Sequence, residues 1–182
     1  MNVITSFFLR AKHWQLFLLI FGTYCVGEFW AMKSIVTAQP AVRTGGFGLL
    51  FWVFMALFGF SFLSWFWAMG SFLSSIVRSD LKMKLGFFRF ALIYPIFYAF
   101  FFFKFVLSAH PVQAFVIAPL HLFAIFCLIY ILYFDSKSLA LAERNESVSF
   151  SDYIGPFFLL WFFPIGIWII QPKINRLYVE KT

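Results

Sequence analysis

Long apolar runs separated by short polar stretches extend over almost the whole chain. Runs of about 20 helical residues are long enough to cross the roughly 30 Å hydrocarbon layer of a bilayer. The pattern predicts an all-α fold, a polytopic transmembrane helical bundle that forms a single membrane domain over residues 1–182. The four predicted spans cover residues 14–32, 48–77, 86–108 and 112–134.

The last apolar run, residues 153–171, is open to two interpretations. Pro164 and Gly166 favour a hinge there, although Pro and Gly are also tolerated inside spans. If the run bends and returns, 11 Lys and Arg lie on the side of the N-terminus and two on the other; if it crosses, the numbers are eight and five. Basic residues concentrate on the cytoplasmic side, so we predict four spans plus a Pro/Gly-bent, re-entrant C-terminal membrane segment, with five spans as the alternative.

The stretch 135–152 is the one sizeable polar connection, and we predict that it is a cytoplasmic loop. Its first half consists of good helix formers, so the fourth helix is expected to continue out of the bilayer into water. The loop is too short to form a soluble domain. Any cytosolic activity is therefore expected to belong to a partner.

Composition supports the membrane interpretation and limits the partners. The chain is 63% hydrophobic and 12% charged, whereas soluble domains average about 25% charged residues. The net charge of +7 comes from scattered Lys and Arg, without the basic stripe of a nucleic-acid-binding surface. We expect a lipid bilayer as surroundings, no direct contact with nucleic acid, and a cytoplasmic N-terminus in a bacterial inner membrane. The predicted cytoplasmic basic face contains Arg78, Lys82 and Lys84.

Three polar side chains fall inside predicted spans at similar depths. Glu28 follows Trp14 by 14 residues and Lys104 follows Arg89 by 15, so each has risen roughly 21–23 Å into the bilayer. His121 approaches the same outer half from the other side. Because charges inside spans are costly, Glu28, Lys104 and His121 are candidates for a polar layer that binds an ion or relays protons. The alternative is structural: Lys104 extends to the interface and Glu28 pairs with it between helices.

The second span contains small residues at helical spacing. Ser64 and Ala68 are four residues apart, as are Gly70 and Ser74. Small side chains at this spacing let helix backbones approach closely. We expect these residues to serve helix packing or self-association into a homo-oligomer.

Catalysis has little support in the sequence. The chain contains no HExxH or GxSxG motif, no Gly-rich phosphate loop and no paired carboxylates on one helix face. We therefore predict no catalytic, metal-binding or cofactor-binding residues, and a protein that is not an enzyme.

The C-terminal stretch Phe150–Asn175 resembles an ending found in many small uncharacterised bacterial inner-membrane proteins. That resemblance implies a polytopic membrane protein and no particular activity. In size and layout the chain is also similar to four-span membrane subunits of phage-defence systems such as Kiwa. This second likeness implies a role as sensor or anchor in antiviral defence.

Two functional hypotheses follow from these features. The first is a non-enzymatic inner-membrane subunit that self-associates and presents its basic cytoplasmic face to a soluble partner. The second is an ion channel, small transporter or membrane-depolarising effector whose path is lined by Glu28, Lys104 and His121.

Overall fold

The structure, a computed structural model, describes residues 3–37, 49–106 and 114–181, and these are helical apart from short connections. This confirms the predicted all-α class. In chain order the elements are α1 (Val3–Arg10), α2 (His13–Phe17), the π-helical turn η1 (Leu18–Gly22), α3 (Thr23–Thr37), α4 (Leu49–Ile76), α5 (Leu85–Val106), α6 (Ala114–Arg144), α7 (Phe150–Trp161) and α8 (Phe163–Lys181).

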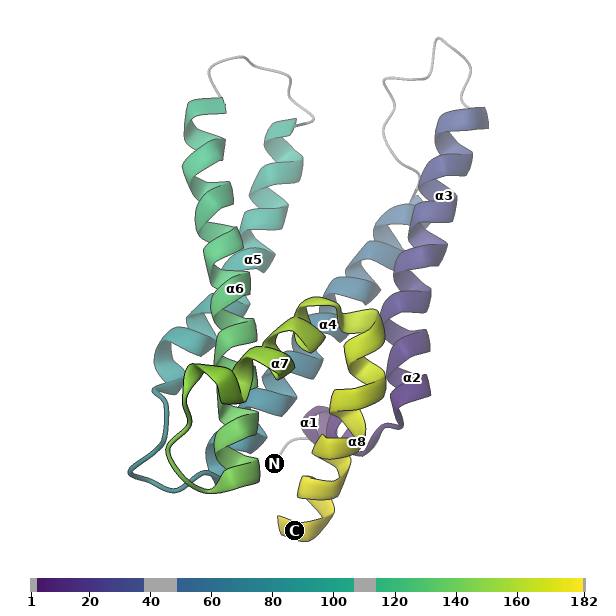
Figure 1. Cartoon of the computed structure of the whole chain (residues 1–182). Coiled ribbons are helices and arrows are strands. Elements are labelled where there is room, and N and C mark those ends of the chain that lie inside the picture. Colours follow the sequence, from purple (N-terminus) through teal and green to yellow (C-terminus); the bar gives the residue numbers. More distant parts are fainter. Residues whose placement is uncertain (1–2, 38–48, 107–113, 182) are drawn as a thin grey trace.

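Within the described residues, four helices are long and apolar enough to cross a membrane, as the sequence predicted. They cover His13–Ser34, Leu49–Ile76, Leu85–Phe102 and Ile117–Arg144. Figure 1 shows them as two arms: α3 with α4, and α5 with α6. The arms contact each other through α4 and α6 and diverge toward the end where α3 and α5 finish, which we call the far end. The opposite end holds α1, the connection 77–84 with the start of α5, the end of α6, the connection 145–149 and the C-terminal half of α8, and we call it the terminal end.

The first span is one long helix with a π-helical turn in it. Such turns leave main-chain carbonyls without their usual i+4 partner. The hydroxyl of Thr23 donates to the carbonyl oxygens of Leu19 at 2.7 Å and of Ile20 at 3.0 Å, so the turn is satisfied locally. Leu16 and Ile20 are fully buried, which places this part of the span against the core.

The fourth span continues well past the predicted boundary at Phe134. Helix α6 ends at Arg144, and Asn145 then adopts a left-handed conformation (φ 56°) that stops the helix. Residues 135–144 are therefore helix, and most of 135–141 is buried against the bundle. The helix thus continues past Phe134 as the sequence indicated, but the expectation that this part lies in water was wrong, because most of 135–141 packs against the bundle.

The C-terminal segment forms a helical hairpin. Helix α7 ends at Trp161, its C-cap residue Phe162 leaves helical geometry (φ −91°, ψ 58°), and α8 returns from there to the terminal end (Figure 1). The bend thus lies two residues before Pro164, which occupies the first turn of α8, where proline is well tolerated. Gly166 lies directly against the carbonyl of Leu159, in space that a Cβ atom could not share. The close approach of α8 to α7 therefore depends on Gly166.

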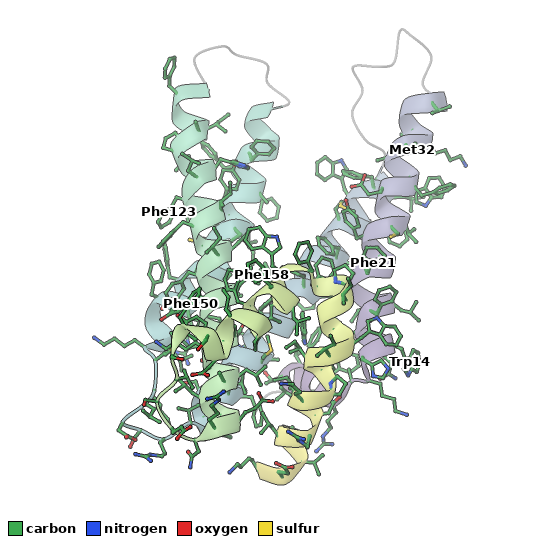
Figure 2. The ribbon with its side chains drawn as sticks, viewed as in Figure 1. Trp14, Phe21, Met32, Phe123, Phe150 and Phe158 are labelled. Atoms are coloured by element: carbon green, nitrogen blue, oxygen red, sulfur yellow. The ribbon has the colours of Figure 1, made fainter. Side chains whose placement is uncertain are left out.

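The outer surfaces of the spans are apolar and exposed. Phe97, Phe100 and Phe115 expose 69%, 76% and 89% of their surfaces, which water would disfavour and lipid accepts. Figure 2 shows the complementary pattern, with nitrogen and oxygen atoms gathered at the terminal end and carbon-only side chains, including Phe123, over the arms. The membrane character predicted from composition is thus visible in the arrangement of the side chains.

Candidate functional site

The predicted polar layer is not brought together in the described part of the chain. Glu28 lies exposed on α3 and His121 lies exposed on α6, in different arms of the molecule (Figure 1). Among the described residues Glu28 forms no ion pair. The side chain of Lys104 lies outside the described residues. His121 instead meets Tyr98 of α5, whose hydroxyl is 2.7 Å from Nδ1.

The predicted packing residues of α4 lie largely inside the chain's own bundle. Ala68, Gly70 and Ser74 are buried, whereas Ser64 is half-buried and lines a groove next to α5. A Cβ atom on Gly70 would overlap the ring of Phe88 and the carboxylate of Asp135. The missing side chain of Gly70 therefore lets Phe88 of α5 and Asp135 of α6 pack directly against α4.

Asp135 is a fully buried carboxylate at this three-helix contact. Its neighbours include Gly70 and the stacked rings of Phe88 and Phe134, whose centroids are 4.1 Å apart. Neither carboxylate oxygen has a hydrogen-bond partner among the described residues. A buried polar group without a partner costs about 1–3 kcal/mol, so Asp135 is the polar group of this structure that most needs an explanation. Sequence reasoning missed it, because its position after the fourth apolar run resembled the start of a loop.

A second buried polar cluster joins the two termini. The side-chain amide of Gln171 on α8 accepts a hydrogen bond from the indole N–H of Trp65 at 2.9 Å. It also donates to the carbonyl oxygens of Phe8 at 2.9 Å and Ala11 at 3.0 Å. These two carbonyls lie at the C-terminal end of α1, where helices leave such groups unpaired. Gln171 thus fixes α1 between α4 and α8.

Asn175, one turn further along α8, extends this cluster. Its amide donates to the carbonyl oxygens of Leu9 at 2.6 Å and Ala11 at 3.3 Å. The sequence signal was available but weak: Gln171 and Asn175 stand four apart in an apolar helix, which places both on one face.

The terminal end is strongly basic. Because α8 returns, its basic residues join those of the connection 77–84 and of α1 and α6. Eleven of the 14 Lys and Arg lie in elements at this end: Arg10, Lys12, Arg78, Lys82, Lys84, Arg89, Lys137, Arg144, Lys173, Arg176 and Lys181. The predicted members Arg78, Lys82 and Lys84 are all exposed there.

Several acidic residues at this end are already occupied by ion pairs. The pairs are Arg78–Asp80 at 2.6 Å, Arg144–Asp152 at 2.8 Å, Lys173–Glu143 at 3.0 Å and Arg176–Glu180 at 3.8 Å. The hydrogen bond from Arg78 lowers the pKa of Asp80. Lys82 and Lys84 form no ion pair among the described residues, so the end keeps a surplus of positive charge.

The start of α7 is organised by Asp152. Its carboxylate accepts hydrogen bonds from the backbone N–H of Ser149 at 2.7 Å and from the Ser149 hydroxyl at 2.8 Å. These bonds, with the charge of Arg144, hold the pKa of Asp152 below its ordinary value. Ser149 and Asp152 stand three residues apart, as in a capping box, and α7 begins at Phe150.

No family model, curated protein or solved structure matches the chain. The site must therefore be judged on its own geometry. In the three described ranges, no cluster of three His, Cys, Asp or Glu side chains could hold a metal ion. What the described residues offer is an exposed basic surface at the terminal end and apolar grooves along the arms.

Two apolar hollows accompany this basic surface. One, of about 440 Å³, lies between α6 and α7 and is lined by aromatic side chains that include Tyr130, Tyr133 and Tyr153. The other, of about 890 Å³, lies between α4 and α5 and has Leu128 of α6 at one side. In neither hollow do the lining residues form an arrangement of nucleophile, base and oxyanion donors of the kind that acyl transfer needs.

Proposed function

We propose that the chain is a membrane-embedded binding subunit, without a catalytic step of its own, that presents its basic terminal end to a soluble partner on the cytoplasmic side. The observation that carries the proposal is the return of α8. It adds Lys173, Arg176 and Lys181 to the end that already holds Lys82 and Lys84. Positive charge concentrated at one end of a membrane protein favours that end being cytoplasmic.

Charge at the terminal end supports an acidic soluble partner. Lys82 and Lys84 are exposed in the connection between α4 and α5 and form no ion pair within the described residues, since the nearby Asp80 pairs with Arg78. An acidic surface on a partner would be attracted over roughly a Debye length, about 8 Å at physiological ionic strength. Contact of this kind is expected to weaken as salt is added.

Self-association through the spans is part of the same proposal. Its support is the large exposed apolar surface of the arms, which lipid and protein can both cover. The likeness in size and layout to membrane subunits of phage-defence systems such as Kiwa is the ground for proposing a sensor or anchor role in a bacterial inner membrane. The channel hypothesis has less support, because Glu28 and His121 lie on different arms (Figure 1).

Affinity purification of the full chain from membranes tests this proposal. We expect one soluble protein to co-purify, and its recovery to fall about tenfold in the double variant Lys82→Gln/Lys84→Gln and in high salt. Lys33→Gln, at the far end, is the control and should leave recovery unchanged. A chain that purifies alone as a monomer, or equal recovery with the double variant, would contradict the proposal.

A further inference from the structure

The groove between α4 and α5 has the size and position of a lipid site. Its volume of about 890 Å³ falls within the roughly 300–1,000 Å³ of ligand pockets. Its walls are formed by two predicted spans, so the solvent around it is the bilayer. The lining is apolar apart from the hydroxyl of Ser64 and the indole N–H groups of Trp52 and Trp67.

The groove is long enough for an acyl chain. Along α4 its lining extends from Trp52 to Trp67, and 15 residues of helix rise about 22 Å. One leaflet of the hydrocarbon layer is roughly 15 Å thick, half of about 30 Å. The groove is thus longer than one leaflet is thick. An acyl chain that enters at the Trp67 end fits entirely within it.

A cation lies beside the terminal end of the groove, next to its lining residue Trp67. On α5, Arg89 precedes the lining residues Leu92 and Ile93 by three and four positions, so all three lie on one helix face. The guanidinium of Arg89 lies over the ring of Trp67, 5.8 Å from its centroid. The groove is thus apolar along its length and positively charged where it meets the interface.

Arg89 has no acidic partner within the described residues. All seven acidic residues of the chain are described, and four of them are engaged in the ion pairs of the terminal end. Of the other three, Asp135 is buried, Glu28 lies on α3 in the other arm, and Glu146 lies exposed in the connection 145–149. A second copy of the protein would therefore offer few free carboxylates to Arg89. A phospholipid leaflet, in contrast, places phosphate groups at the depth of Arg89.

From this geometry we propose that the α4–α5 groove binds an anionic phospholipid of the terminal-end leaflet. Its headgroup phosphate contacts Arg89, and an acyl chain lies along the groove toward Trp52. Arginine is well suited to this role because its planar guanidinium donates two parallel hydrogen bonds to phosphate oxygens. The proposal is independent of the soluble partner proposed above, since it concerns the spans.

Native mass spectrometry of the full chain in detergent tests the site, with phosphatidylglycerol and phosphatidylcholine as probes. We expect wild type to retain phosphatidylglycerol in preference to phosphatidylcholine, and Arg89→Gln to weaken that binding roughly tenfold. Arg176→Gln removes an equal charge at the same end on α8, away from the groove, and should leave binding unchanged. Ala99→Phe, which fills the groove, should reduce the retention of both lipids.

Several outcomes would overturn the proposal. These are equal retention of the two lipids by wild type, equal loss in Arg89→Gln and Arg176→Gln, and full retention in Ala99→Phe. Dimers that disappear in Ala99→Phe would show that a second copy occupies the groove. Thermal unfolding in lipid-free detergent checks that each variant is folded, and a variant that unfolds early is replaced by Ala56→Phe, at another lining position.

Discussion

At the scale of single residues, the buried Asp135 is the feature that departs most from an apolar bundle. Its oxygens lack partners among the described residues, and its fit depends on the missing side chain at Gly70. Natural proteins retain such groups where they serve function or specificity, and otherwise replace them with apolar residues. Substituting Asp135 therefore tests whether its carboxyl serves the stability of the bundle or another role.

Substituting Asp135 with leucine should stabilise the fold. Leucine has the same branched skeleton without the polar oxygens, so the variant loses the cost of an unpartnered buried carboxyl, about 1–3 kcal/mol. The unfolding temperature of Asp135→Leu in detergent is expected to exceed that of wild type. A lower unfolding temperature would mean that the carboxyl makes a stabilising contact beyond those of the described residues. Loss of partner recovery in a stable variant would mark Asp135 as functional.

A second residue, Asp152, should make part of the stability depend on pH. Its pKa is lowered in the folded chain, so it stabilises the fold above its unfolded pKa of about 3.9. That contribution is lost as pH falls through the lowered pKa. The difference in unfolding temperature between wild type and Asp152→Asn should therefore be largest near neutral pH and shrink below about pH 4.

The control for this pH dependence is Glu146→Gln. Glu146 lies in the connection 145–149, directly before α7, and forms no ion pair among the described residues. At neutral pH, the unfolding temperature of Glu146→Gln should differ less from that of wild type than the unfolding temperature of Asp152→Asn does. A difference for Asp152→Asn that does not change between pH 7 and pH 3 would rule out a charged, hydrogen-bonded Asp152.

At the scale of elements, the α7–α8 hairpin depends on one close approach. A side chain at position 166 would meet the backbone carbonyl of Leu159, which cannot move without opening the hairpin. Gly166→Ala is expected to destabilise the fold by about 1–3 kcal/mol. Gly155→Ala is the matched control, because a Cβ there meets nothing within 4 Å and alanine favours the helix. Equal unfolding temperatures for the two variants would contradict this role of Gly166.

Sequence reasoning predicted the elements better than their ends. Apolar length alone located four spans, because crossing a bilayer imposes that length on any helix. Sequence reasoning also indicated that the fourth helix continues past Phe134, but it placed that continuation in water, whereas α6 buries Asp135 and Ser136 there. Burial of polar residues there depends on α4 and α5 packing against them, and a linear pattern contains no information about such contacts.

The candidate site was predictable to a similar degree. Lys82 and Lys84 were recognisable because charge in a short connection must be exposed. Glu28 and His121 share a similar predicted depth, but depth along helices does not determine which arm each helix joins, and the two residues lie apart. Arg89 and Trp67 were not singled out as a pair, since their contact joins α4 to α5 across the connection.

At the scale of the whole molecule, charge and apolar surface are segregated. The arms expose aromatic and aliphatic side chains, and the terminal end gathers most of the basic ones (Figure 2). The return of α8 strengthens this segregation, since a straight fifth crossing would carry Lys173, Arg176 and Lys181 to the far end. The direction of the last segment is thus the point on which the proposed basic face rests.

Cysteine labelling of membrane vesicles tests that point most directly. In a chain with Cys25 and Cys127 replaced by serine, single cysteines are placed at Lys82, at Lys181 and, for the far end, at Met32. An impermeant maleimide should label positions 82 and 181 together in inside-out vesicles and position 32 in right-side-out vesicles. Labelling of position 181 from the same side as position 32 would show a fifth crossing and contradict the account.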